Sequence, residues 1–315
     1  MQVIRTSSLI TPRNIMEPLS TITRDILRIC YYFRIDRHAV ISYSVELFDK
    51  LFENILDSAI AKSFIWLGNE SIDLTESMDF GSKLQMLIDR GECFDYLYLI
   101  VFGFDIPMNI RELYGRNHYR TLCVAICILI ASKARGEGSS SLSSAEITRL
   151  MEEINAPAKL CSVDTVNSIE INILNLINHD ANIKPLNIFV ETLLSSTIRF
   201  FQRNNLNYMN VDNLVKISQL ITQNYYLSRF EVLSQLFRIE YQIEFQIVLL
   251  EHIVALENLS RDRMLIAAGI VASVIYMNRL ETFNREELLH FLSDTTAIPI
   301  DRIRNCRNVL IELNC

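Results

Sequence analysis

Residues 121–136, TLCVAICILIASKARG, decide the fold, because they have the pattern of a buried helix up to its last turn. Leu122, Ile126, Leu129 and Lys133 are spaced four, three and four residues apart, which places them on one face of a helix. The amine of Lys133 therefore ends a row of core positions. A lysine at such a position must either extend its apolar stem to water or meet an opposite charge.

Helical periodicity continues on both sides of this stretch. A Ser143-x-x-Glu146 pattern, typical of a capping box, begins a further helix that runs through Glu153. The chain has only 8 Gly and 6 Pro in 315 residues, which favours long helices. No segment has a convincing strand pattern, so we expect an all-α fold. The other main helices are expected at 22–33, 38–55, 163–180, 187–201, 261–278 and 300–313.

The chain is expected to consist of two helical halves. Each half contains an apolar helix with many short side chains, 121–132 and 264–278, which neighbouring helices could surround. Pro185 in the stretch NIKPL (182–186) breaks the helical pattern between them. We therefore expect an N-terminal arm at 1–20, a first fold at 21–183 and a second fold at 184–315. Residues 56–117 do not follow the helical rhythm and are expected to be an insertion in the first fold.

Composition and motifs argue against several function classes. The net charge of −7 and the lack of a long basic run argue against a non-specific nucleic-acid groove. The seven cysteines form no C-x-x-C pair, which favours free thiols in a reducing compartment. The five histidines lack zinc-ligand spacing, and no phosphate-binding glycine loop or nucleophile elbow is present. We therefore expect no metal, no cofactor and no enzymatic activity.

A membrane protein is also not expected. The longest uncharged apolar runs are shorter than the roughly 20 residues that a membrane-spanning helix needs. The N-terminal residues lack the apolar core of a signal peptide. The expected location is therefore inside the cell.

Four charged residues lie on faces that are otherwise apolar. Arg24 precedes Leu27 on one helix, and Asp49 lies between Val45 and Phe52 on the next. Because an unpaired buried charge is very unfavourable, opposite charges on core faces predict ion pairs. We expect Arg24 to pair with Asp49, and Lys133 to pair with Glu170 where the ends of two helices meet. Removal of one member of a truly buried pair would cost about 3–5 kcal/mol.

These positions resemble the first box of the cyclins. Arg24 lies in TRDIL (23–27), Asp49 lies in ELFDKLF (46–52), and Lys133 ends ASK (131–133), with Leu122 eleven residues before it. Glu170 follows on a later helix. The resemblance implies two tandem cyclin-like folds of five helices each, with 56–117 inserted between the second and third helices of the first fold. It also implies that Arg24, Asp49 and Leu122 hold the fold together.

Within the cyclins, the chain is most similar to the family of cyclin N-terminal domain-containing protein 1 and the nematode crossover site-associated protein. The likeness lies in SYSVELFDKLF (42–52), PLNIFVETLL (185–194), MLIAAGIVASVIYMN (264–278) and LLHFLSDTTAI (288–298). It implies a role at meiotic recombination sites in the nucleus, in crossover designation and maturation. The implied partners are a cyclin-dependent kinase and crossover factors of the mismatch-repair type.

The resemblance also implies where a kinase would bind. In cyclins, residues at the positions of Lys133 and Glu170 contact the regulatory helix of the kinase. The surface expected around this pair includes Ile130, Leu174 and His179. A salt bridge with a purely structural role, without any partner, is the competing interpretation of Lys133 and Glu170.

Two other functions remain open from the sequence. The first is a conventional cyclin that activates a cell-cycle or transcription kinase, although such a cyclin would not need residues 56–117. The second is a cyclin-fold scaffold that binds proteins or DNA without any kinase. A DNA-binding scaffold predicts a basic face, which the net charge of −7 makes less favourable.

Overall fold

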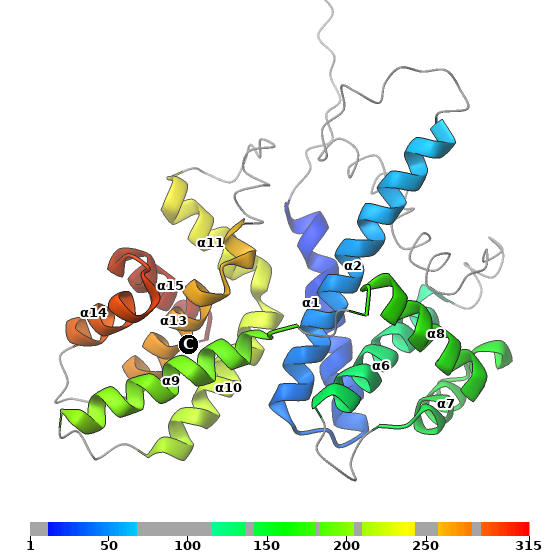
Figure 1. Ribbon diagram of the computed structural model, residues 1–315, viewed down its shortest axis with the longest axis horizontal. Helices are drawn as coiled ribbons and strands as arrows, with labels where there is room; N and C mark the ends of the chain where they lie inside the picture. Colours follow the sequence, from blue (N-terminus) through cyan, green and yellow to red (C-terminus); the bar gives the residue numbers. More distant parts are fainter. Residues whose placement is uncertain are drawn as a thin grey trace, which may run out of the picture. The chain divides into compact units, whose positions relative to one another are not determined.

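The computed structural model describes residues 12–67, 115–135, 142–179, 183–204, 210–242, 258–278 and 285–314. These residues are helical throughout, with short connections and no strand among them, so the all-α prediction is confirmed (Figure 1). The chain divides into two compact units, and each is described by itself. One is Arg24–Ile183, and the other combines Met1–Thr23 with Lys184–Cys315, so one division falls within the first helix and one between Ile183 and Lys184. We call Arg24–Ile183 the first unit, and Lys184–Cys315 with Met1–Thr23 the second unit.

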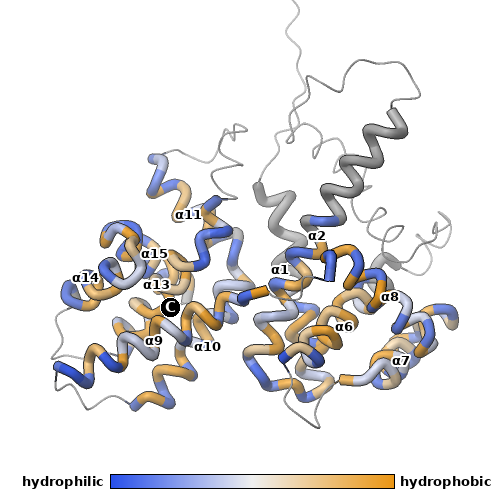
Figure 2. The backbone as a smooth tube through the Cα atoms, in the orientation of Figure 1, coloured by the Kyte–Doolittle hydropathy of each residue, from blue (hydrophilic) through white to orange (hydrophobic). Residues whose placement is uncertain are grey.

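Helix α6 (Gly115–Arg135) is the central element of the first unit. Every residue from Leu122 to Ala131 is almost completely buried. Helix α6 packs against α2 (His38–Leu67), α7 (Ser144–Glu153) and α8 (Val163–Leu176). Leu122, Ile126 and Leu129, the apolar row of the sequence analysis, therefore lie in the core. Figure 2 shows α6 as mainly apolar. Helix α1 (Pro12–Tyr32) and the short 3₁₀ helix η1 (Ala158–Leu160) complete this part of the chain.

Helix α13 (Arg263–Met277) has the same role in the second unit. Its residues Leu265 to Ile275 are buried, and it packs against α9 (Leu186–Arg203), α10 (Val211–Leu227), α14 (Arg285–Thr296) and α15 (Ile300–Asn314). Helix α11 (Arg229–Tyr241) packs against α10 and α15. The prediction that each half surrounds an apolar helix is therefore confirmed. Figure 1 shows α13 among its neighbours.

Short side chains allow α13 to approach α15 closely. A Cβ atom built on Gly269 would lie 2.3 Å from Sγ of Cys306 and 2.9 Å from its Cβ. These separations are far below van der Waals contact, so the missing side chain at Gly269 is what makes room for Cys306. The sequence signal of Ala and Gly in 264–278 thus reflects a close helix–helix contact.

Side-chain caps begin several helices. Ser143 and Glu146 form the predicted capping box at the start of α7, which is thereby confirmed. Asp262 accepts a hydrogen bond from the backbone N–H of Leu265 and so caps α13. Ser162 and Asn210 cap α8 and α10 in the same way. These caps satisfy N–H groups that have no partner within the helix.

Three helices of the first unit end with a residue in the left-handed conformation. Arg34, Asn155 and Asn178 have φ angles of 54°, 55° and 54°. After α1, the N–H of Ile35 donates to the carbonyl of Cys30 and that of Arg34 donates to the carbonyl of Tyr31, which is a Schellman motif. Glycine or asparagine usually occupies this position. Arg34 is therefore an unusual choice.

Two helix boundaries differ from the sequence expectation. Helix α1 begins at Pro12 rather than at 22, so a helix starts inside the segment that was expected to be an arm. Helix α2 continues to Leu67 rather than ending near 55, so the expected insertion begins later than 56. Neither Gly nor Pro interrupts 38–67, and helices propagate readily through such a stretch. The remainder of the expected insertion, 68–114, lies outside the described residues.

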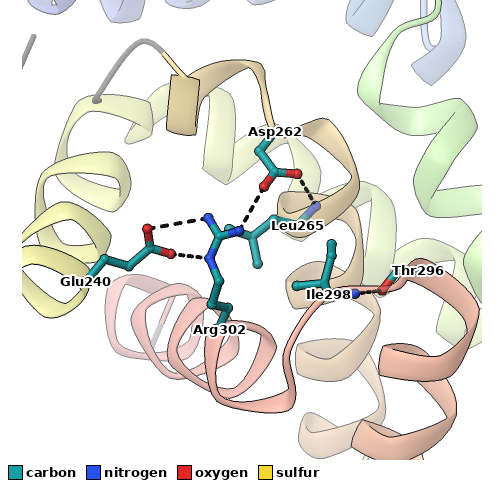
Figure 3. A network of polar contacts seen from close by, with 6 residues as sticks. All are labelled: Glu240, Asp262, Leu265, Thr296, Ile298 and Arg302. Atoms are coloured by element: carbon teal, nitrogen blue, oxygen red, sulfur yellow. Dashed lines mark hydrogen bonds and ion pairs between the residues drawn. The ribbon is translucent and has the colours of Figure 1, made fainter. Parts of the chain in front are cut away.

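The second unit contains a three-residue ion-pair network. Arg302 of α15 lies between Glu240 of α11 and Asp262, the cap of α13 (Figure 3). Its Nε donates to Oε1 of Glu240 over 2.6 Å, and its Nη1 donates to Oδ2 of Asp262 over 3.4 Å. Burial alone would lower the pKa of the Arg302 guanidinium, but the hydrogen bonds and charges of Glu240 and Asp262 raise it. One guanidinium thus connects three helices.

Candidate partner-binding surface

The predicted Lys133–Glu170 pair is present. Nζ of Lys133 lies 2.7 Å from Oε1 and 2.8 Å from Oε2 of Glu170, so the amine donates to both carboxylate oxygens. The side chain of Lys133 is 50% exposed and that of Glu170 is 12% exposed. Lys133 therefore both extends to water and meets an opposite charge.

The helices place the two charges differently from the expectation. Lys133 lies in the last turn of α6, where a cation is favourable beside the negative end of the helix dipole. Glu170 lies in the middle of α8 rather than at its end. Only one of the two charges is therefore at a helix terminus. The pair forms because α6 and α8 pack directly on each other.

Arg135 holds the chain beside the pair. Its Nη2 donates to the backbone carbonyl of Ile183 over 3.0 Å, and its guanidinium carbon lies 5.1 Å from the ring centroid of buried Tyr43. The cation–π contact and the hydrogen bond fix the segment where the first unit ends. The sequence reasoning missed this role, because nothing in ASKARG indicates which backbone carbonyl lies near.

The end of α8 is fixed by side-chain and backbone contacts. The side-chain amide of Asn54 in α2 donates to the carbonyl of Leu176 over 2.8 Å. Asn178 and His179 are both left-handed, and the N–H of His179 donates to the carbonyl of Leu174. Nε2 of the exposed His179 lies 2.8 Å from Oδ1 of Asn175. These contacts fix the backbone at the C-terminal end of α8, the helix that carries Glu170.

The other residues expected around the pair differ in exposure. Ile130 is only 4% exposed, which corrects the expectation that it is available to a partner. It belongs to the core because neighbours cover α6 on several sides. Leu174 is half-buried, and His179 is exposed. Ile171, an apolar residue that the sequence reasoning did not single out, directly follows Glu170 and is 55% exposed.

The expected buried pair of Arg24 and Asp49 is wrong. Arg24 is exposed, and no ion pair joins it to Asp49, which is half-buried. At about 100° per residue, Arg24 faces away from the buried residues Ile22 and Ile26 of the same helix. The neighbouring Asp25 instead lies toward the core side.

Asp25 makes the ionic contact of α1 with α6. Its Oδ2 lies 2.9 Å from Nε of Arg120, and the two side chains are 15% and 27% exposed. The sequence pattern did not single out Arg120. By contrast, Leu122 is completely buried, as expected for a residue that holds the fold.

The exposed amine of Lys133 can contact a partner. An ammonium group has three donors, and Glu170 engages Lys133 through its two oxygens, so the exposed side of the amine can also donate to a partner. Within the described part of the chain, no group of three or more His, Cys, Asp or Glu side chains could hold a metal ion. None of the described helices is long and apolar enough to span a membrane.

Comparisons of the chain with protein-family models, with curated proteins and with solved structures found no match. The cyclin resemblance therefore stays a prediction from the residues quoted above.

Proposed function

We propose that the protein is a non-catalytic, cyclin-like regulator that acts in the nucleus at meiotic recombination sites. In this proposal it promotes crossover designation and maturation together with a cyclin-dependent kinase. Crossover factors of the mismatch-repair type are the further proposed partners. Neither direct nucleic-acid binding nor membrane association is part of the proposal.

The observation that carries the proposal is the pair of Lys133 and Glu170. The two residues occupy the positions that the cyclin resemblance assigns to the kinase contact, and their side chains meet at 2.7 Å. The Lys133 side chain is half-exposed, so a partner can reach it without disturbing the core. A charge-assisted hydrogen bond to a partner contributes roughly 1.5–3 kcal/mol when it is shielded from water.

The fold of the first unit gives further support. Its described residues contain α2, α6, α7, α8 and the part of α1 from Arg24 on, which together give the five helices expected of a cyclin box. The described part of the second unit has six complete labelled helices, α9, α10, α11, α13, α14 and α15, besides the first half of α1, which is more than a five-helix fold. The support for a second cyclin-like fold is therefore weaker than for the first.

The test is co-purification of a kinase from germline tissue, identified by mass spectrometry. We expect the double variant Lys133→Ala/Glu170→Ala to lose the kinase. Because an ion pair this exposed contributes at most about 1 kcal/mol to stability, the variant should stay folded by circular dichroism. If the variant recovers as much kinase as the wild type, Lys133 and Glu170 do not contribute to the kinase interface. The pair would then be a structural salt bridge.

A matched control variant lies in the second unit. Arg304 and Glu286 form an exposed ion pair at 2.8 Å between Nη2 and Oε2. The variant Arg304→Ala/Glu286→Ala removes the same two charges without touching the first unit. It should recover the kinase like the wild type. Loss in both variants would point to a general charge effect.

The burial of Ile130 favours one alternative function. Apolar side chains at the centre of an interface usually carry most of the affinity, and Ile130 is not available to do so. A kinase-independent scaffold at the same recombination sites would need no such contact. Recovery of crossover factors without any kinase, in wild type as well as in the pair variant, would favour this scaffold.

A further inference from the structure

An exposed stripe of arginine and tyrosine runs along α1, away from the core. Arg24, Arg28 and Tyr31 are spaced four and three residues apart and so share one face of the helix. The buried residues Ile26 and Cys30 occupy the opposite face. Arg34, which is also exposed, follows in the turn that ends the helix. We call Arg24, Arg28, Tyr31 and Arg34 the arginine stripe.

Tyr31 is the most exposed large apolar residue of the described chain. It is 87% exposed, whereas the next highest value is 58% for Leu220. Tyr32 beside it is 44% exposed. Two adjacent tyrosines in water, next to guanidinium groups, offer both a flat apolar contact and charged donors.

The guanidinium groups of the stripe have little local compensation. Within the described residues, no carboxylate forms an ion pair with Arg24 or Arg34. Arg28 has only a 3.9 Å contact with Asp25, whose other oxygen lies against Arg120. The positive charge is therefore available to a ligand.

Helix α7 extends the same surface. The hydroxyl of Tyr32 donates to Oε2 of Glu153 at the end of α7. That hydrogen bond raises the pKa of the Tyr32 phenol, and the nearby charge of Arg149 opposes the rise. Arg149 is exposed and, like Arg24, has no carboxylate partner in the described part of the chain. It adds a further positive charge beside the stripe.

The backbone at Arg34 argues against a merely solvated face. Its φ of 54° is left-handed, a conformation that is unfavourable for a residue with a Cβ. The equivalent turns after α7 and α8 use asparagine. An arginine at a glycine position keeps a guanidinium at the end of the stripe at the expense of local stability. Gln242 and Ala297 adopt the same conformation after α11 and α14, so the backbone at Arg34 supports the stripe only together with its exposed charges.

We propose that the arginine stripe binds a short acidic segment of a partner protein. Carboxylates of the segment pair with the guanidinium groups, and an apolar side chain of the segment lies on Tyr31. From Arg24 to Arg34 the stripe spans about 15 Å, which suits a short peptide. The proposal does not depend on Lys133 or Glu170.

A nucleic acid is the less favoured occupant. Non-specific nucleic-acid binding typically uses six to ten phosphate contacts, more than this stripe provides. The net charge of −7 also repels a long polyanion, whereas a short peptide samples mainly the local charge.

The test is fluorescence anisotropy with a labelled peptide of alternating glutamate and leucine residues. The whole chain should bind this peptide more tightly than one of alternating glutamine and leucine, and added salt should weaken the binding. The variant Arg24→Ala/Arg28→Ala/Arg34→Ala should bind about tenfold more weakly, because it loses three exposed charge contacts that are each weak.

The control removes three exposed cations of the second unit, Arg199, Arg203 and Lys216, by substitution with alanine. Its affinity for the glutamate peptide should equal that of the wild type. The proposal is overturned if the wild type does not prefer the glutamate peptide, or if the triple arginine variant binds it equally well. Tighter binding of an oligothymidine that is lost in the triple variant would also overturn it, in favour of a nucleic acid.

Arg34→Gly separates binding from structure. Glycine relieves the left-handed strain, so the melting temperature should be no lower than that of the wild type. The affinity for the glutamate peptide should nevertheless fall. A lower melting temperature with unchanged affinity would mean that Arg34 is structural, against the proposal.

Discussion

At the scale of single residues, His38 is the titratable side chain with the clearest consequence for stability. It begins α2, is 8% exposed, and its Nδ1 has no hydrogen-bond partner in the described part of the chain. Burial lowers the pKa of His38 from 6.5 to about 4. The folded protein therefore holds this imidazole neutral.

We expect stability to fall with pH between about 6.5 and 4 because of His38. In this window the unfolded chain binds a proton that the folded chain does not, so the free energy of unfolding decreases as the pH falls. The loss should reach up to about 3 kcal/mol and then level off, because both states are protonated below the folded pKa. Urea unfolding at a series of pH values measures it.

His38→Gln should remove most of this pH dependence. The control is His290→Gln, a substitution at an exposed histidine, which should leave the wild-type slope. If the slope between pH 6.5 and 4 is the same in His38→Gln and wild type, His38 is not the group responsible.

The ion pairs show which charge contacts could be predicted from the sequence and which could not. Lys133 and Glu170 could be paired from their places in apolar rows. Arg24 was misplaced because it was aligned with Leu27, whereas the buried row of α1 is Ile22, Ile26 and Ile29, which puts Asp25 rather than Arg24 toward the core. Arg120 and Arg135 act through partners far away in the chain, and no local pattern reports such partners.

At the scale of elements, the close contact of α13 with α15 depends on Gly269. A Cβ at this position would lie 2.3 Å from Sγ of Cys306 and 3.3 Å from Cδ1 of Leu310. Alanine in place of glycine normally stabilises a helix interior by up to about 1 kcal/mol. Here we expect the opposite sign, because overpacking of a buried contact costs about 1–3 kcal/mol.

Gly269→Ala should therefore lower the free energy of unfolding, measured by urea denaturation. Combining it with Cys306→Ala removes the closest atom and should recover part of the loss, although the Cβ of residue 306 stays 2.9 Å away. If Gly269→Ala stabilises the protein, α13 and α15 do not approach as closely as described.

Helix identity was easier to predict than helix length. The apolar stretches at 121–132 and 264–278 contain enough short and branched side chains to require burial on all sides, and both are core helices. Helix α2 extends to Leu67 because its sequence has no residue that stops it. Helices α10 and α11 are separated only at Ser228. No Gly or Pro lies there, so the sequence does not indicate this boundary.

At the scale of the whole molecule, the two units contain separate cores. Helix α6 organises one and α13 the other. One division falls between Ile183 and Lys184 and a second within α1, after Thr23. The sequence analysis expected a boundary between 183 and 184 because Pro185 interrupts the helical pattern, but it did not expect Met1–Thr23 to group with the second unit. A defect in one core should therefore act mainly within its own unit.

The Arg302 network is the place to test this separation. Arg302→Ala leaves Glu240 and Asp262, which are 17% and 29% exposed, without their shared cation. We expect a loss of about 1–2 kcal/mol, since the arginine is one-third exposed and water screens the contact in part. The same loss should loosen α11, α13 and α15, the helices that the network joins.

Amide hydrogen exchange followed by mass spectrometry measures the exchange rate of each helix, so the stability of the two units can be compared separately. In Arg302→Ala, exchange in α13 and α15 should accelerate while exchange in α6 and α8 stays at the wild-type rate, because local opening reports local stability. The matched control is Arg304→Ala. Arg304 has the same 35% exposure as Arg302, but its partners Glu286 and Asp301 are 56% and 85% exposed, so their loss should matter little. Equal acceleration of α6 and α13 in Arg302→Ala would mean that the two cores open as one.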